Sequence, residues 1–327
     1  MKKQLKIQLN KLNFKLGRNP KIEAPEDRKK YIPESYKAAV LISADFELAW
    51  AWRFDKQHPD PVQLGIEKAR KTRQSFSRLI AMFEAYDIPI TWATVGHLFL
   101  DSCNGTHPEV KRQDFFENDY WKYSNGDWFD ADPETDYKQD PEWYAPDLIQ
   151  QIEDSSVAHE IGCHTFSHID CRDEACPAEV FASDIDACIA AADTKNIRLE
   201  SFVHPAHTIG NLKTLREKGF TNYRTDDYNK LSYPKYKDGL WQLENTVELA
   251  YNPNWTLSYH LYRFKTIIDR AIASGTLACL WFHPSLPADF VKEVMEPLLA
   301  YLHDKKDELW VTTHKEYVAY LEKHRNE

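Results

Sequence analysis

Short apolar runs alternate with helix-like segments from residue 39 to the end of the chain. Segments with apolar residues three or four positions apart separate many of the runs, and Thr313-His314-Lys315-Glu316 is a capping box that predicts a last helix. Strands that alternate with helices form parallel sheets. The strand-like runs cover 39–47, 88–95, 157–162, 199–203, 220–223, 240–243, 276–282 and 309–312, and the helical segments cover 66–83, 177–189, 211–218 and 259–274. Seven or eight such units favour a closed or nearly closed barrel, with its active site at the carboxyl ends of the strands.

Two regions fall outside this alternation. Residues 1–36 are rich in lysine, and the pattern of Leu5, Ile7 and Leu9 predicts a basic arm or a peripheral strand before a main unit at 37–327. Residues 101–146 lack periodicity and are rich in aromatic and acidic residues. We expect this insertion to be a packed lid, since so many aromatics argue against disorder. Its aromatic side chains are explained equally well by burial and by stacking on sugar rings.

Charge and cysteine content exclude several classes of protein. The formal net charge of −10 argues against nucleic acid or an anionic membrane as the main partner. No uninterrupted apolar run has the length of a signal peptide or a membrane span. The six cysteines include no C-x-x-C pair, so free thiols in a cytoplasmic protein are expected.

Two pairs of side chains are candidates for a metal site. His164 and His168 stand four positions apart, and on a helix that spacing places both rings on one side. Asp45 and Glu47 stand two positions apart in the first predicted strand, and such side chains leave a strand from the same face. Two histidines and one carboxylate cover one side of a metal and leave the other side free for water and substrate.

Four segments in a fixed order resemble the polysaccharide deacetylases of the nodulation-protein type, carbohydrate esterase family four. Residues 43–47 (SADFE) stand at the first family motif, in the Asp-x-Glu form of one branch. Residues 164–168 (HTFSH) match the second motif and 280–284 (LWFHP) match the last, while 88–97 (IPITWATVGH) is also similar to that branch. The resemblance covers the chain from about residue 39 onward. It implies a distorted (β/α)7 barrel of the glycoside hydrolase/deacetylase type.

The resemblance also implies a role for each matched residue. Glu47, His164 and His168 are the implied ligands of one divalent ion, most readily Zn²⁺, with Co²⁺ or Ni²⁺ as alternatives. Asp45 is the implied general base, and His283 the implied catalytic acid. The chemistry agrees, because a bound divalent ion lowers the pKa of its water and an adjacent carboxylate then accepts the proton at neutral pH.

One position departs from the family pattern. The third motif usually carries an arginine that orients the catalytic aspartate, and Ala206 stands at that position. We therefore expect His204 or His207 to orient Asp45 instead, or catalysis to be weakened. Further candidates for the pocket or for support of its residues are His97, His204, His207, Arg224, Asp226 and Trp281.

The leading hypothesis is a metal-dependent hydrolase that removes an acetyl or related acyl group from an amino sugar of a polysaccharide or glycan precursor. Its partner is then a glycan or amino-sugar substrate. A second hypothesis is hydrolysis of a small amide or cyclic ureide on the same barrel. A third is a metal-bearing carbohydrate-binding protein with weakened catalysis, which the alanine at position 206 motivates.

Overall fold

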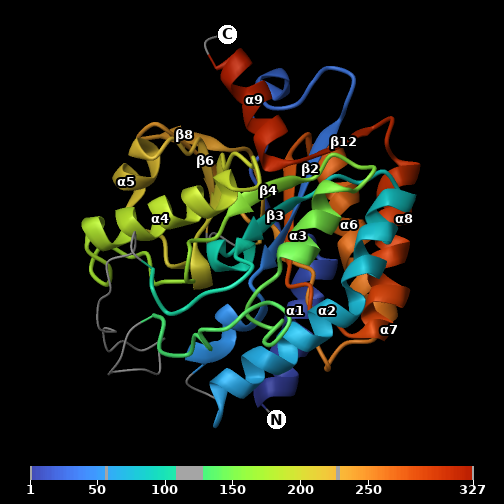
Figure 1. Cartoon of the computed structure of the whole chain (residues 1–327). Helices are drawn as coiled ribbons and strands as arrows, with labels where there is room; N and C mark the ends of the chain where they lie inside the picture. The colour runs from blue at the N-terminus through green and yellow to red at the C-terminus, as the bar shows by residue number, and fades with distance from the viewer. Residues whose placement is uncertain (1, 56–57, 108–127, 226–228, 326–327) are drawn as a thin grey trace.

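The computed structural model describes residues 2–55, 58–107, 128–225 and 229–325, and its main sheet curls around the interior as an incomplete barrel (Figure 1). The neighbour order is β10-β11-β2-β3-β4-β5-β6-β9-β8, and β12 pairs with the first half of β2. All of these pairs are parallel except β8 with β9. The strands are β2 (Ala38–Phe46), β3 (Thr91–Thr94), β4 (Glu160–Cys163), β5 (Ser201–Val203), β6 (Asn222–Arg224), β8 (Lys235–Lys237), β9 (Leu240–Leu243), β10 (Val247–Glu248), β11 (Leu277–Phe282) and β12 (Leu309–Thr312). The parallel sheet expected from the alternating pattern is confirmed.

Helices flank this sheet, with α2, α6 and α8 grouped on one side and α4 and α5 on the other (Figure 1). Asp60 caps α2 by accepting from the Gln63 amide, and Gly275 ends α6 in a left-handed conformation. The helices are α1 (Lys2–Lys15), α2 (Pro61–Ala85), α3 (Pro146–Glu153), α4 (Ala178–Asp193), α5 (Leu212–Glu217), α6 (Leu257–Ser274), α7 (Ala288–Phe290), α8 (Glu296–Asp304) and α9 (His314–His324). None of the helices in the described part of the chain is long and apolar enough to cross a membrane.

Strand β2 is the structural centre of the molecule. All nine of its residues are buried, which is typical of a parallel strand covered on both faces. Aromatic side chains from three elements pack beside it: Trp92 on β3 lies 5.9 Å from Phe46 and 5.1 Å from Phe76 of α2, ring centroid to ring centroid. Phe282 at the end of β11 contacts the same cluster. This core holds the carboxyl ends of β2, β3 and β11 in place.

The register of the sheet gathers polar residues at one edge. Phe282 of β11 pairs with Ala44 of β2, and Asp45 of β2 pairs with Ala93 of β3. The parallel strands therefore end side by side. The residues at or directly after these ends are Asp45 in β2, Glu47 after β2, His164 after β4, His204 after β5, Arg224 in β6, Glu248 in β10 and His283 after β11. The carboxyl edge of the sheet is thus a single polar site, as expected for a βα barrel.

The N-terminal segment differs from its predicted form. Residues Lys2–Lys15 form helix α1, so a strand at Leu5–Leu9 is wrong, and only Lys21–Ile22 (β1) pairs as a strand, in parallel with β7 (Lys230–Leu231). Arg270 of α6 fastens the helix by donating to the carbonyl of Phe14 at 2.7 Å and lying over its ring at 4.5 Å. The alternation of Leu5, Ile7 and Leu9 covers only five residues, which is too short to distinguish a strand from a helix.

The described part of the 101–146 insertion packs into the protein. Trp128, Phe129, Trp143 and Tyr144 are all at most 4% exposed. Their burial explains their presence, and none of them presents a face to a sugar. The Trp50 indole donates to the Trp143 carbonyl at 3.1 Å, which joins the insertion to the segment after β2. Trp121 and Tyr123, in the centre of the aromatic stretch, lie outside the described residues.

Candidate active site

Glu47, His164 and His168 bring three ligand-type atoms together at the carboxyl edge. Oε1 of Glu47 lies 2.9 Å from Nε2 of His164 and 3.2 Å from Nε2 of His168. The three side chains are at most 5% exposed. Ligand atoms about 2.1 Å from one ion and at right angles to one another would lie about 3 Å apart, so the spacing suits a shared metal.

The proton positions on His164 support a cation at this point. Its Nδ1 lies 2.7 Å from the carbonyl oxygen of Val203, and a carbonyl only accepts, so Nδ1 carries the proton. In a neutral ring Nε2 then presents a lone pair to the carboxylate of Glu47. Two acceptors facing each other at 2.9 Å need a proton or a metal ion between them, and the carbonyl on the far nitrogen is the usual support of a metal-bound histidine.

The two histidines lie on a loop after β4, so the helical spacing used to pair them is wrong. Thr165 and His168 have positive φ values of 62° and 57°, which no helix contains. Asp184 of α4 holds this loop: its carboxylate accepts from the Phe166 amide at 2.6 Å and from the Ser167 hydroxyl at 2.7 Å. The loop turns back on itself and thereby aims both rings at Glu47.

Arg53 fastens the same loop from the other side. It is 1% exposed, and its guanidinium donates to the carbonyl oxygens of Ser167 at 2.6 Å, of Trp128 at 2.9 Å, and of Trp50. One buried cation therefore joins the histidine loop, the 101–146 insertion and the segment after Glu47. Neither Arg53 nor Asp184 belongs to a recognisable motif, because each bonds to groups that only the folded chain brings near.

We expect Asp184→Asn to weaken metal binding although Asp184 is not a ligand. The carboxylate of Asp184 accepts hydrogen bonds through both oxygens. In asparagine one of these oxygens becomes an NH₂ group, which would face a donor of the loop, so the loop would lose its fixed shape. Loss of such an outer partner typically costs about 10–100-fold in metal affinity. Asp186→Asn is the matched control, because Asp186 lies on the same helix with a side chain 49% exposed and pairs with Lys218. Isothermal titration with Zn²⁺ measures both variants, and equal affinities would contradict the role of Asp184.

Asp45 is held by an arginine that comes from an unexpected strand. The guanidinium of Arg224 donates a hydrogen bond to each carboxylate oxygen of Asp45, from Nη1 at 2.5 Å and from Nη2 at 2.6 Å. Arg224 also donates to the Ser43 hydroxyl at 3.0 Å and lies 4.6 Å from the centroid of the Trp281 ring. Burial opposes the charge on Asp45, but Arg224 outweighs it and lowers the pKa of Asp45. The carboxylate is therefore ionised and fixed in orientation.

The expectation that His204 or His207 orients Asp45 is wrong. His204 is 1% exposed, and its Nε2 faces the Gly210 carbonyl at 3.2 Å. His207 lines the pocket beside Ala206, with its ring 5.0 Å from that of Trp281. Burial lowers the pKa of both histidines to about 3, so both rings are neutral. An uncharged ring does not supply the counter-charge that the guanidinium of Arg224 provides.

His283 lines the same pocket and lies near two carboxylates, Glu47 and Glu248. Its Nε2 is 3.6 Å from Oε2 of Glu47, and its Nδ1 is 3.5 Å from Oε1 of Glu248. Burial disfavours the charged ring, but Glu47 and Glu248 outweigh it and raise the pKa of His283 to about 9. The ring is thus protonated and can act as an acid. Glu248 ends the two-residue strand β10, which is too short to be found from periodicity.

The pocket continues into a neighbouring hollow. The first cavity, of about 310 Å³, is lined by Asp45, Glu47, His168, His207, Trp281 and His283 among others. The second, of about 370 Å³, shares Trp52, Glu248 and His283 with it and extends to Lys68 and Lys71. The Lys68 ammonium lies 4.8 Å from the centroid of Trp52. The two hollows are therefore adjacent, and the ring of Trp52 lines both.

The remaining predicted residues divide into three groups. Trp281 lines the pocket, as expected. His97 is fully buried outside it, in a separate cluster with Asp132, so a place in the pocket lining is wrong for this residue. Asp226 lies outside the described residues. Trp52 and Glu248, which line both hollows, were missed because neither follows a recognisable strand or motif.

Comparison with solved structures identifies the architecture. A protein from Mycobacterium smegmatis assigned as a polysaccharide deacetylase superposes with a TM-score of 0.64 at 14% identity, covering 93% of this chain and 95% of its own. A protein from Pseudomonas aeruginosa PAO1 with the same assignment gives 0.63 at 12% identity, covering 91% and 98%. This chain has the polysaccharide deacetylase fold. The expected (β/α) barrel of this type is confirmed.

The deacetylase fold is shared by an enzyme of different activity. PuuE allantoinase superposes with a TM-score of 0.61 at 13% identity, covering 91% of this chain and 97% of its own. No protein-family model and no curated protein sequence matches the chain. The fold therefore rests on structural similarity, and the activity must be argued from the site.

Proposed function

We propose that this protein is a divalent-metal hydrolase that removes an acetyl or related acyl group from an amino sugar. The observation that carries the proposal is the convergence of an acid, a base and a group of metal-ligand type on one pocket. Arg224 holds Asp45 as an ionised carboxylate. His283, whose pKa is raised, lies close to both Asp45 and Glu47. Glu47 also belongs to the group that includes His164 and His168.

Each side chain has a definite task in this proposal. Glu47, His164 and His168 would hold the ion, which supplies an acidified water and polarises the acyl carbonyl when bound. Each oxygen of Asp45 keeps a second lone pair beyond its bond to Arg224, so Asp45 accepts the proton of the attacking water. His283 gives its proton to the leaving amine nitrogen, and Glu248 stabilises its charge before that transfer.

The shape of the cleft favours a glycan over a small amide. Two adjacent hollows offer room for more than one sugar ring, and the aromatic ring of Trp52 lines both. Lys68 and Lys71 line the second hollow and add positive charge there. Hydrolysis of a cyclic ureide is the second candidate, because PuuE allantoinase resembles this chain about as closely as the assigned deacetylases do.

The contact between Arg224 and Asp45 supports an active enzyme over one with weakened catalysis. Ala206 suggested that Asp45 lacked its counter-ion, and Arg224 supplies one from β6. A guanidinium that donates from both Nη atoms to the two oxygens of a carboxylate fixes the orientation of that carboxylate more firmly than a single hydrogen bond does. We therefore favour hydrolysis over glycan binding without turnover.

Acetate release tests the proposal. Full-length protein loaded with Zn²⁺ or Co²⁺ is incubated with a panel of N-acetylated oligosaccharides and, separately, with allantoin. We expect acetate from at least one oligosaccharide, loss of release after removal of metal with a chelator, and recovery when the ion returns. Turnover of allantoin alone would support the second candidate. Tight glycan binding by metal-loaded protein without any acetate would overturn the enzyme assignment.

A further inference from the structure

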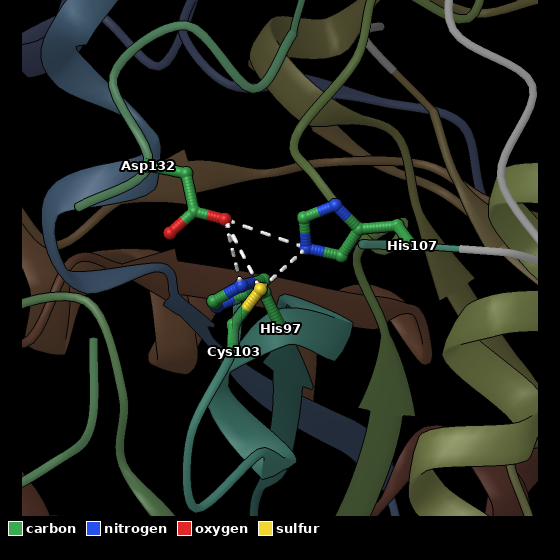
Figure 2. A group of neighbouring side chains, drawn as sticks. All are labelled: His97, Cys103, His107 and Asp132. Atoms are coloured by element: carbon green, nitrogen blue, oxygen red, sulfur yellow. Dashed lines mark hydrogen bonds and ion pairs between the residues drawn. The ribbon is translucent and has the colours of Figure 1, made fainter. Parts of the chain in front are cut away.

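A second group of side chains of metal-ligand type lies next to the loop that carries His164 and His168. Figure 2 shows His97, Cys103, His107 and Asp132 converging on one point from different directions. His97 belongs to the turn Gly96–Phe99 after β3, and Asp132 follows Cys103 by 29 positions. The group thus joins the two flanks of the 101–146 insertion. We propose that these four residues bind a structural zinc ion.

The spacing of the four atoms is close to that around a tetrahedral ion. Oδ2 of Asp132 lies 3.3 Å from Nε2 of His97, 3.4 Å from Nε2 of His107 and 3.5 Å from Sγ of Cys103, and Cys103 Sγ lies 3.1 Å from His107 Nε2. Ligands about 2.0–2.3 Å from a tetrahedral zinc are about 3.3–3.8 Å apart, so the three distances from Asp132 fit and the distance between Cys103 and His107 is slightly shorter. Zinc is also the ion that best suits a mixture of thiolate, imidazole and carboxylate.

Hydrogen bonding alone does not account for the group. Nδ1 of His97 lies 3.3 Å from the Trp143 carbonyl, which only accepts, so this nitrogen carries the proton. Nε2 then presents a lone pair to the carboxylate of Asp132, and it is a buried atom that makes no hydrogen bond. A second proton on this ring is disfavoured, because the side chain is fully buried. A cation between the two acceptors resolves this conflict.

The supporting contacts also have the form of a built metal site. The Gly105 amide donates to the sulfur of Cys103 at 3.2 Å, and a positive φ of 75° lets this glycine turn its amide toward the sulfur. Oδ1 of Asp132 accepts from the Glu134 amide at 3.0 Å, which leaves Oδ2 for the ion. His107 stacks on Phe129, with ring centroids 4.2 Å apart. Such contacts orient ligands around a metal.

Four protein ligands close the coordination sphere, which is typical of structural rather than catalytic zinc. The ion would still matter to the active site. The amide of His97 donates to the Phe166 carbonyl at 3.0 Å, within the loop that carries His164 and His168. The His97 ring also lies 4.4 Å from that of Trp50, in the turn that follows Glu47. A zinc ion here would hold the insertion against both segments of the catalytic site.

Cobalt titration of the full-length protein tests the proposal without any substrate. This site has a sulfur ligand, and Glu47, His164 and His168 include none, so only this site gives a sulfur-to-cobalt charge-transfer band. We expect that band in the wild type and in Glu47→Gln, and its loss in Cys103→Ser. Cys176→Ala is the matched control and keeps the band, since Cys176 is a buried thiol outside both groups.

Two results would overturn the proposal. One is the absence of the charge-transfer band from the wild type at saturating Co²⁺, and the other is an unchanged band in Cys103→Ser. If Cys103→Ser does not fold, Asp132→Asn provides the second variant, which should retain the band with cobalt affinity at least about 10-fold lower. Unchanged affinity in Asp132→Asn would contradict the ligand set. Failure of acetate release leaves all of these readouts intact, so the two proposals are tested separately.

Discussion

Replacing Arg224 with methionine is expected to lower kcat for acyl hydrolysis by about 10²–10⁴-fold, the range that a general base contributes. Methionine keeps much of the buried volume but removes both bonds to Asp45. The pKa of Asp45 would rise, because burial and the nearby Glu47 carboxylate both oppose its charge once the guanidinium is gone. Steady-state kinetics with metal content measured in parallel checks the result, and the metal content should not change.

The same substitution should also reduce stability. Removing one partner of a buried ion pair typically costs about 3–5 kcal/mol in the free energy of unfolding. Asp45→Asn combined with Arg224→Met should recover part of this loss, because no charge is left unpaired, while activity stays low. Arg198→Met is the matched control: Arg198 is 81% exposed and pairs with Glu200 at the surface, so a change below about 1 kcal/mol is expected. Wild-type kcat in Arg224→Met would contradict the assignment of Arg224 as the positioning residue of Asp45.

Glu47→Gln is expected to remove one equivalent of bound metal and to lower kcat by more than about 10²-fold. The amide has the shape of the carboxylate but not its charge, so it no longer draws a divalent ion to His164 and His168. Inductively coupled plasma mass spectrometry of protein dialysed against Zn²⁺ measures the loss of metal. Unfolding curves of the metal-free proteins show whether the fold is intact.

Glu248→Gln separates metal binding from proton transfer. Glu248 lines the same cleft and faces His283 at 3.5 Å, but it is not part of the group formed by Glu47, His164 and His168. We expect this variant to keep the wild-type metal content while its kcat falls, because His283 loses a partner that raises its pKa. Loss of metal in Glu248→Gln, or full retention in Glu47→Gln, would show that the ligands are wrongly assigned.

Local sequence patterns were sufficient for much of the fold. Long apolar runs such as 39–47 and 276–282 can be buried only as central strands, and both are. The sequence pattern failed to identify two elements. Helix α1 contains apolar residues whose spacing fits a strand as well as a helix, and strand β10 has only two residues. Contacts with distant parts of the chain decided those elements.

For the candidate site, the sequence by itself determined which residues stand at the ends of strands. Asp45, Glu47, His164 and His283 follow from strand patterns and motif order, because a motif records side chains close together in the chain. Arg224 is 179 positions from Asp45, and His97, Cys103, His107 and Asp132 come from parts of the chain up to 35 positions apart. Only the tertiary structure decided these pairings, because barrel curvature and loop packing bring together charges that no local pattern connects.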